Sequence, residues 1–413
     1  MAKICKIYDV LIIGAGAAGL FLAANLRGKS VAVLEKNATP GKKILASGGG
    51  RCNVTNHRID ASNYLGDADF VKNILKNLDF KDVLKFFGEL KFNEQKQNQF
   101  FCESGAKDVL GVLLKRARQS GAQIFCGVCV KGARKILADE NGQILEKLKS
   151  EQTEIFEVLA ENGDKFYAKN LVVASGGLSY KSLGASSIGY EIAQSFGTSV
   201  TTPAPALVGF TVQKDEFWFK NLSGVCFPAE ISVVCASKNA ANREPKMPRK
   251  FAGDILFTHK GISGTAVLNA SLFWQKGLIA INFCPNFSIE TAQKSKKQLS
   301  TVLPLPRRFT LEFLRAAGLS DKPYCEYKAD EAAKISRLFA YEFAPAGTFG
   351  FERAEVTKGG VDTDALDANC GHNDTRGLYF IGEVLNVTGM LGGYNLHFAF
   401  ACAANLAKRL NAE

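Results

Sequence analysis

The chain has 413 residues, of which 46% are hydrophobic and 22% are charged. This length and balance exclude a disordered chain and a small disulfide-stapled domain, and they allow two or three domains with a large core. The net charge of +11 is unevenly spread. Residues 201–342 hold 19 Lys and Arg against 12 Asp and Glu (+7), and the rest holds 32 against 28 (+4). A basic segment of this kind fits either a polyanionic partner or a solvated basic surface.

The first predicted element is an apolar strand, residues 10–13, that ends on the pattern Gly14-x-Gly16-x-x-Gly19. An Ala- and Leu-rich helix follows, then a second apolar strand that ends on Glu35. In a dinucleotide-binding unit, Gly14 permits a tight turn, Gly16 lets a pyrophosphate approach the backbone, and Gly19 lets the helix pack closely on the sheet. The helix N-terminus attracts phosphates, and Glu35 would accept both ribose hydroxyls. These elements together predict an adenine-dinucleotide site.

Residues 10–26 are apolar or small apart from Asn25, which is a pattern that signal peptides and membrane anchors share. The glycine spacing and the preceding Asp9 are better explained by a strand and a helix. No other stretch of the sequence is long enough to span a bilayer. We therefore expect a cytoplasmic protein that does not associate with membranes.

Eleven cysteines are scattered singly, apart from Cys126 and Cys129. This pair lies in residues 123–130, which we predict as one strand, so that the two thiols would point to opposite faces. With no second CxxC and no nearby histidine, we interpret both as structural cysteines and predict no metal site. Val130 ends this stretch and is a candidate cofactor contact.

A glycine-rich loop at residues 41–56 follows the second strand. It carries Lys43, three consecutive glycines that end at Gly50, and then Arg51, Cys52 and Asn53. Such a sequence is not a core pattern, and it is typical of a loop that a ligand approaches closely. Its N–H groups, Arg51 and Lys43 could serve phosphate or flavin oxygens.

Further along, the periodicity predicts two helices within residues 70–90, a helix at 106–119, a strand at 155–159 and a turn at Asn141-Gly142. A buried strand at residues 171–173 ends on small residues, and it would return beneath the cofactor. Gly184 and Gly189 do not have the GxGxxG spacing, so we find no second complete nucleotide site. NAD(P)H as the electron donor stays open, because a nicotinamide can bind without a Rossmann unit of its own.

The composition shifts at residues 201–205, where a second domain begins. Alternating runs at 207–212, 229–235 and 279–283 predict antiparallel strands, closed by helices at 310–317 and 331–343. His259, one of four histidines, lies in a Thr-, Ser- and Gly-rich loop that is either a surface turn or a functional loop. We expect residues 1–200 and 343–413 to form a cofactor domain and 201–342 to form an inserted substrate domain.

The tail returns to the first domain with a buried strand that ends on Gly382 and Glu383. Glu383 or a neighbouring N–H group would reach a ribityl chain. An apolar helix then begins near Tyr394. Its positive end would stabilise the negative charge of a reduced flavin if it points at the N1–C2=O edge.

With these motifs in place, the chain resembles the BaiN/YhiN-like flavoproteins, a family also labelled aminoacetone oxidase-like, over essentially its whole length. The resemblance rests on the glycine triplet at 14–19 and on the segments 47–56, 174–180, 256–264, 356–361 and 392–396. It implies an α/β fold, in which a Rossmann-like FAD domain of the two-dinucleotide-binding type carries an inserted β-barrel and a small helical domain. It also implies non-covalent FAD.

The chain departs from the family pattern at a few positions. Asn386 and His397 stand where the family usually has Asp and Gln. Cys102 and Thr265 each replace a proline. The loss of a negative charge at Asn386 would alter the redox potential or the substrate preference.

These features predict an FAD-dependent oxidoreductase that passes hydride through flavin N5. The resemblance implies reduction of an activated C=C bond, as in steroid-like enones or in uracil of ribosomal RNA, or oxidation of amino ketones. The basic insert favours ribosomal RNA, and the alternatives are a small-molecule substrate and a flavin-bearing binding protein. Our catalytic candidates are His259 and Cys52 as proton donors and Arg51 as an oxygen clamp. The residues that we predict to contact the cofactor are Gly14, Gly16, Ala17, Gly19, Glu35, Lys36, Lys43, Gly50, Arg51, Asn53, Val130, Ala174, Ser175, Gly176, Gly382, Glu383, Gly393, Tyr394, Asn395 and Leu396.

Overall fold

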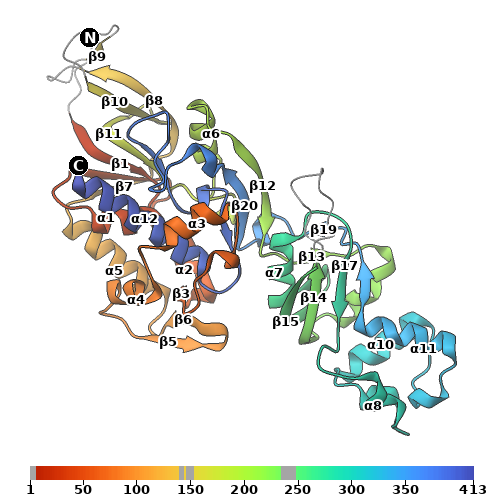
Figure 1. Cartoon of the computed structure of the whole chain (residues 1–413). Coiled ribbons are helices and arrows are strands. Elements are labelled where there is room, and N and C mark those ends of the chain that lie inside the picture. Colours follow the sequence, from red (N-terminus) through yellow and green to blue (C-terminus); the bar gives the residue numbers. More distant parts are fainter. Residues whose placement is uncertain (1–5, 139–143, 146–152, 234–247) are drawn as a thin grey trace. The chain divides into compact units, whose positions relative to one another are not determined.

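The computed structural model describes residues 6–138, 144–145, 153–233 and 248–413. The chain divides into two compact units, Met1–Ala204 with Val356–Glu413, and Pro205–Glu355 (Figure 1). The second unit extends past residue 342, the predicted end of the insert, because its sheet is completed by one strand that crosses this residue and one that follows it. These are β18 (Tyr341–Phe343), which pairs with β17, and β19 (Gly347–Thr348), which pairs with β13.

The first unit is built on a sheet whose strands, over the described residues, follow the order β7-β2-β1-β11-β10-β8-β9, with β21 also paired to β11. Its parallel part comprises β7 (Gln123–Cys126), β2 (Val31–Glu35), β1 (Ile7–Ile13), β11 (Lys165–Val173) and β21 (Leu378–Phe380). Its antiparallel part comprises β10 (Thr153–Ala160), β8 (Val130–Ala138) and β9 (Ile144–Leu145). The apolar runs of β1 and β2 are fully buried, as expected for central parallel strands.

Helix α1 (Ala17–Asn25) packs against both α5 (Ala106–Gln119) and α12 (Tyr394–Ala412) beside this sheet (Figure 1). The other elements of the unit are α2 (Lys42–Ala46), η1 (Ser47–Gly50), β3 (Asn53–Asn56), η2 (Ala61–Asn63), β4 (Tyr64–Leu65), α3 (Ala68–Leu75), α4 (Phe80–Phe86), β5 (Phe92–Gln95), η3 (Lys96–Asn98), β6 (Gln99–Cys102), η4 (Lys181–Leu183), α6 (Ile188–Ser195), β12 (Val200–Ala206), β20 (Val356–Val361), η9 (Thr363–Ala365), η10 (Gly382–Val384) and β22 (Thr388–Gly389). Strands β12 and β20, by which the chain leaves and re-enters this unit, pair with each other.

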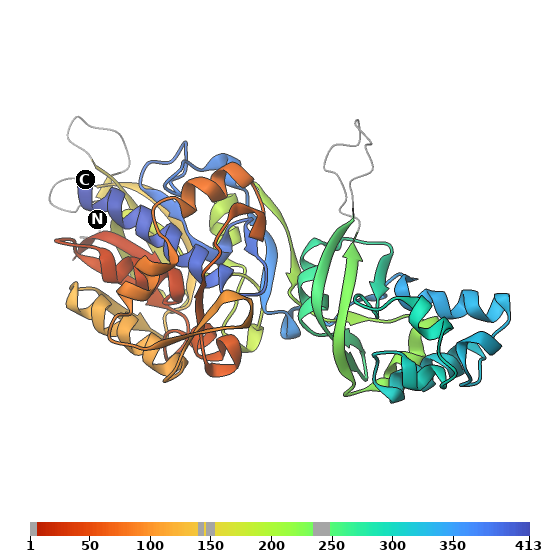
Figure 2. The same cartoon turned by 60° about the horizontal axis from the view of Figure 1, so that its bottom comes forward.

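The second unit is an antiparallel sheet of order β18-β17-β14-β15-β16-β13-β19. Its further elements are β13 (Phe210–Thr211), η5 (Lys214–Leu222), β14 (Cys226–Val233), β15 (Arg249–Thr258), β16 (Gly261–Ser263), α7 (Thr265–Phe273), β17 (Ile279–Asn282), α8 (Ile289–Gln293), α9 (Leu299–Val302), α10 (Arg307–Ala317), η6 (Tyr324–Glu326), α11 (Ala329–Ser336), η7 (Arg337–Phe339) and η8 (Phe351–Arg353). Helix α7 packs on β14 and β15, and the helices of residues 289–336 gather at one end of the sheet (Figures 1 and 2). Buried rings of Phe257, Phe283 and Phe309 join those helices to the sheet.

Two predicted elements are wrong in detail. Residues 123–130 form two strands rather than one, because Gly127 turns the chain with a φ of 74°. Cys126 and Cys129 therefore lie at the junction of two strands and not on opposite faces of one. The helix predicted at 331–343 ends at Ser336, and its last residues form β18, whose buried–exposed–buried alternation is a strand pattern. The turn predicted at 141–142 lies outside the described residues, and no helix within them is long and apolar enough to span a bilayer.

Candidate cofactor and active site

The turn between β1 and α1 uses its three glycines in two different ways. Gly14 has a φ of 108°, and a Cβ there would stand 2.4 Å from the carbonyl oxygen of Ala174. A Cβ on Gly19 would stand 2.0 Å from the carbonyl oxygen of Gly14. A Cβ on Gly16, in contrast, would meet nothing within 4 Å. The protein's own packing thus requires Gly14 and Gly19, whereas Gly16 borders open space.

Gly16 is the N-cap of α1, and no side chain caps the helix there. Ala17 is the first helical residue, and the first turn contains no acid. The first N–H groups of a helix have no partner within the helix, and they carry the positive end of its dipole. The start of α1 can therefore receive an anionic group.

Glu35, at the end of β2, is buried and already holds three hydrogen bonds. Its Oε2 accepts from the N–H of Ala15 at 3.0 Å, and its Oε1 accepts from the backbone N–H and the side-chain amide of Asn37 at 2.8 and 2.7 Å. An ionised carboxylate offers about four acceptor positions, so one remains, on Oε2. Lys36, which follows Glu35, is exposed. The segment that leads to Val130 lies beside Glu35, because the N–H of Val128 donates to the Glu35 carbonyl at 2.9 Å.

Lys43 and Glu383 lie 340 residues apart in the sequence, and their side chains meet at 2.6 Å. The other oxygen of Glu383 accepts the N–H of Thr357 at 3.0 Å. The Thr357 hydroxyl oxygen in turn accepts the N–H groups of Leu178 and Ser179 at 2.8 and 3.0 Å. This network fixes the first loop, the segment after β11, strand β20 and the tail against one another.

The small residues after β11 are shaped by this network. Gly176 has a φ of 74°, and a Cβ on Gly177 would stand 2.6 Å from the Thr357 side chain. Ala174 is buried against the Gly14 turn. The buried hydroxyl of Ser175 faces Gly189 of α6 and has no hydrogen-bond partner among the described residues.

Strand β3 lies at the N-terminus of α12. Gly393 caps this helix with a φ of 91°, and a Cβ there would stand 2.7 Å from Oδ1 of Asn53. This Oδ1 is buried and has no hydrogen-bond partner among the described residues, while the amide nitrogen of Asn53 donates to Gln99 at 3.2 Å. Asn395 uses its side chain to bind both backbone groups of Gly389, at 2.8 and 2.9 Å. Tyr394 begins the helix, and Leu396 is partly exposed.

The glycines at 48–50 form an exposed turn with φ values of 56°, 65° and 86°, a left-handed backbone that glycine adopts without strain. Arg51 is exposed, and its guanidinium lies 4.5 Å from the centre of the Phe101 ring. Cys52 is different. Its side chain is fully buried, and this burial raises the pKa of its thiol to about 12. A thiol sealed from solvent is a poor site for exchanging protons, so this geometry does not favour Cys52 as the proton donor.

His259 belongs to the second unit, unlike the cofactor candidates. It is exposed in the turn between β15 and β16. The turn is closed by the Thr258 hydroxyl, which accepts the N–H groups of Lys260 and Gly261 at 3.2 Å each. This accounts for the Thr- and Gly-rich sequence as a surface turn, and a catalytic role for His259 stays a prediction.

The family model described as HI0933-like protein Rossmann domain matches residues 8–409 of the chain. The chain belongs to this family. A ribosomal RNA dihydrouridine synthase of Haemophilus influenzae is 36% identical, over 97% of this chain and 98% of that protein. A 3-dehydro-bile acid delta(4,6)-reductase of Clostridium scindens is 31% identical over the same shares.

Among solved structures, the 3-ketosteroid-delta4-(5alpha)-dehydrogenase of Rhodococcus jostii has a TM-score of 0.50 and 13% identity, with 98% of each chain covered. This likeness concerns the fold. The predicted family, Rossmann-type α/β fold and oxidoreductase class are confirmed, and membership in the HI0933-like family supports FAD as the cofactor.

The two tail positions at which this member departs from the expected pattern both make internal contacts. The Asn386 amide donates to Asp362 at 3.0 Å and to Thr201 at 3.1 Å, so an Asp there would face another carboxylate. His397 is buried and bonds the Thr55 hydroxyl through Nδ1 at 2.8 Å and the Leu78 carbonyl through Nε2 at 3.1 Å. Because the carbonyl only accepts, Nε2 carries the proton. Burial lowers the pKa of His397 to about 4, so the ring is neutral at pH 7.

The residue-by-residue prediction missed Thr357, Asn37 and Lys358. Thr357 and Lys358 lie in the segment 356–361, which the resemblance had marked without giving a role. Asn37 connects Glu35 to the Leu183 carbonyl at 3.1 Å. Lys358 is half-buried, and burial lowers the pKa of its ammonium group to about 8. Of the three, only Lys358 titrates near neutral pH.

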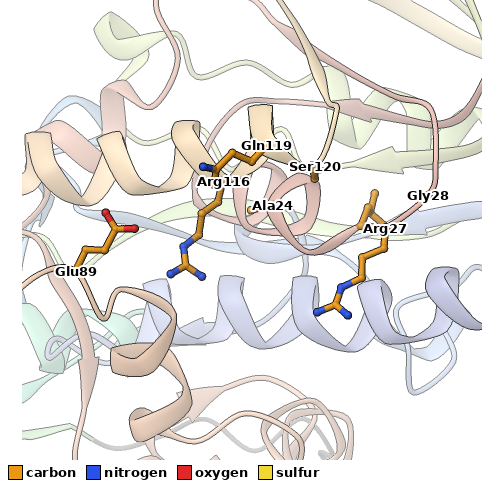
Figure 3. A pocket seen from close by; sticks show the side chains of 8 residues that line it. Ala24, Arg27, Gly28, Glu89, Arg116, Gln119 and Ser120 are labelled. Atoms are coloured by element: carbon orange, nitrogen blue, oxygen red, sulfur yellow. The ribbon is translucent and has the colours of Figure 1, made fainter.

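A surface groove of the first unit lies elsewhere. It is at the C-terminal end of α1, opposite to Gly16, and Figure 3 shows Arg27 and Arg116 beside it. The Arg116 guanidinium rests 4.6 Å from the centre of the Phe86 ring. None of the predicted cofactor contacts lines this groove, so it is separate from the candidate site.

Proposed function

We propose that the protein is an FAD-dependent reductase that saturates the C5=C6 bond of uridine in ribosomal RNA. The observation that carries this proposal is the identity of 36%, over nearly both full lengths, with a protein named ribosomal RNA dihydrouridine synthase. The net charge of +7 in residues 201–342 also favours a polyanionic substrate. Such a reaction belongs in the cytoplasm, where we expect the protein to act.

The residues of the first unit fit an FAD molecule. The start of α1 beside Gly16 would take the pyrophosphate, and the free acceptor position of Glu35 would take one ribose hydroxyl. The buried, unpartnered Oδ1 of Asn53 is an acceptor that a ring N–H of the cofactor would satisfy. The N-terminus of α12 supplies positive charge, and Lys43 would contact the cofactor while it stays paired with Glu383. We propose the contact residues that the sequence predicted, with one correction: Glu35 takes one ribose hydroxyl and not both, because its other acceptor positions are occupied by Ala15 and Asn37.

When bound and reduced, FAD supplies a hydride to one carbon of the C=C bond. The protein must provide a proton for the other carbon, so that the double bond becomes a saturated C–C bond and one hydride and one proton are consumed. A protein group with a pKa near the working pH is best suited to this transfer. Lys358 follows Thr357, whose N–H binds Glu383 of the candidate site, and with its pKa of about 8 it meets that condition better than the buried thiol of Cys52. The electron donor stays open, and NAD(P)H is the candidate that we name for it.

The competing function is reduction of a small-molecule enone, which the 31% identity with a bile acid reductase favours. One experiment separates the two. Nucleosides of ribosomal RNA from a deletion strain and its parent are compared by mass spectrometry, and the purified protein is assayed with a ribosomal RNA fragment and with a steroid enone. We expect dihydrouridine to disappear in the deletion strain and to form in vitro. Unchanged dihydrouridine, with turnover of the enone, would refute the RNA substrate.

A further inference from the structure

The short helix η5 of the second unit carries a row of alternating cationic and aromatic side chains on its outer face. A 3₁₀ helix has three residues per turn, so Lys214, Phe217 and Lys220 share one side. The Phe217 side chain is 44% exposed, and the ammonium group of Lys220 lies 3.4 Å from the centre of its ring. The ammonium group of Lys220 thus covers one face of an exposed aromatic ring, and Lys214 precedes the ring by one turn on the same side of the helix.

Helix α10 carries a second row of the same kind. Arg307, Leu311 and Arg315 follow one another at intervals of four residues, which keeps them on one face of an α-helix. Leu311 is 37% exposed, while Phe309 and Phe313 on the opposite face are buried. The first turn of α10 carries two arginines and no acid. This arrangement opposes the helix dipole and concentrates positive potential at that end.

The two rows lie on elements that pack together. The Trp218 ring of η5 contacts the rings of Phe309 and Phe313 of α10, each at 5.9 Å between centres. Asn221 donates to Glu312 at 2.6 Å, and the Arg308 guanidinium reaches the carbonyl of Ser223 at 3.4 Å. We call the surface of these two rows the η5–α10 face. Its two elements hold Lys214, Lys220, Arg307, Arg308 and Arg315 against Asp215, Glu312 and the buried Glu216, a balance of +2.

This combination matches one kind of partner. Exposed apolar side chains between repelling cations do not suit another apolar protein surface, because burying the cations costs desolvation. A single-stranded nucleic acid can contact both kinds of side chain, since its bases stack on aromatic rings and its phosphates pair with cations. Of the acids on the face, Glu312 is already bound to Arg315 and Asn221. It therefore repels a polyanion less than a free carboxylate would.

We propose that the η5–α10 face binds single-stranded RNA, with Phe217 stacked on a base and the flanking cations on the phosphates. The proposal rests on the proposed function in one respect, that the bound RNA is the substrate. It assigns this contact to the second unit, whereas the cofactor contacts lie in the first. The residues that would contact the RNA lie at the surface, so we expect variants at these positions to fold normally.

The test uses the full-length FAD-loaded protein and a fluorescein-labelled 12-nucleotide RNA that contains uridine. Anisotropy is measured over a series of KCl concentrations. Phe217→Ala is expected to weaken binding about tenfold with an unchanged salt dependence, because stacking releases no counterions. Lys214→Ala combined with Arg307→Ala is expected to weaken it about tenfold and to reduce the slope of log K against log salt by about 1.4, or about 0.7 for each lost phosphate contact.

A matched control lies at the other end of the same sheet. Lys276 is exposed and Leu278 is 59% exposed, and both lie in the loop before β17. The helices follow the opposite end of β17, so this loop lies away from them. Lys276→Ala combined with Leu278→Ala removes one cation and one exposed apolar side chain, and it should bind RNA as the wild type does. Thermal unfolding checks that each variant folds.

Three results would overturn the proposal: no RNA binding by the wild type, wild-type affinity in both η5–α10 variants, or an equal loss in the control. Binding to anionic vesicles that the variants abolish, with RNA binding intact, would assign the face to a membrane surface instead and overturn it as well. If the RNA binds as expected but no dihydrouridine forms, the proposed function fails while the binding surface stands. If dihydrouridine forms in every variant at the wild-type rate and affinity, the surface fails and the function stands.

Discussion

Lys43 and Glu383 of the first unit meet across 340 residues, and Glu35 has a donor at three of its acceptor positions. In the second unit, Lys214, Phe217 and Arg307 lie at the surface. Polar groups of the first unit are thus oriented by the protein itself, as a preformed cofactor site requires. Lys214 and Arg307 of the second are exposed, as suits a large charged partner whose own groups complete the contacts. The difference fits our two proposals, in which the first unit holds the cofactor in a preformed site and the second meets the substrate on an exposed surface.

The largest expected effect concerns the rigid side of this comparison. Gly14→Ala places a methyl group against the Ala174 carbonyl and forces a φ of 108° on a residue with a Cβ. We expect a loss of about 3 kcal/mol in stability. Gly16→Ala is the matched control, because its methyl group meets open space. As apoproteins, the variant and the wild type should unfold at similar temperatures, yet the purified variant should retain little FAD, which absorbance of released flavin measures. Equal FAD content in Gly16→Ala and wild type would contradict a pyrophosphate at this turn.

The next effect is a pH dependence that His397 brings to the first unit. Its pKa is about 4 in the folded protein and 6.5 in the unfolded chain. Between these values the unfolded chain binds more protons, so stability is fully present above pH 6.5 and falls as the pH drops to 4. The loss amounts to about 3 kcal/mol at about 1.4 kcal/mol per pKa unit. Urea unfolding at a series of pH values measures it.

His397→Gln, the residue expected at this position in the family, is the control for that measurement. It does not titrate, so its stability should fall less between pH 6.5 and 4 than that of the wild type. Parallel curves for the two proteins would show that the ring is not buried in its neutral form.

A smaller effect is expected where the first unit's network reaches the tail. Glu383→Ala leaves the buried N–H of Thr357 without its acceptor, at a cost of about 2 kcal/mol. Glu383→Gln keeps an acceptor there and loses only the pair with the partly exposed Lys43, which contributes little. The free energy of unfolding of the apoprotein, measured by urea denaturation, should therefore fall by about 2 kcal/mol in the first variant and by less than about 1 kcal/mol in the second. Equal losses would place the effect on the charge of Glu383.

The smallest effect tests whether Lys358 supplies the proton. As a cation with a pKa of about 8, it donates below that pH, and the rate of a proton-dependent reduction should decline as the pH rises through 8. In Lys358→Arg the decline near pH 8 should disappear and the rate at pH 7 should fall about tenfold, because arginine holds its proton. A decline at pH 8 that persists in this variant would exclude Lys358.

The sequence was enough to predict most of the secondary structure that we described for the first unit. The strand, glycine triplet, helix and acid of residues 10–35 are local, because each follows from a spacing or a backbone requirement that neighbouring residues impose. The helix predicted at 106–119 is α5 within its bounds. Predictions failed where a distant partner decided the outcome. Residues 341–343 are a strand because β17 pairs with them. The chain turns at Gly127 before it enters β8, and the Gly127 N–H donates to the carbonyl of the distant Asn37 at 3.0 Å.

Only the tertiary structure decided which predicted residues act together. Lys43 and Glu383 carried no sequence signal of their contact, since a salt bridge over 340 residues has no spacing to read. Cys52 sits in the loop that the sequence marked as functional, yet its side chain turns into the core. The charge of the second unit was visible in the composition, but the alternating rows on η5 and α10 depend on which helix type each segment adopts. Composition thus determined that this unit is basic, and folding decided where that charge surrounds an exposed ring.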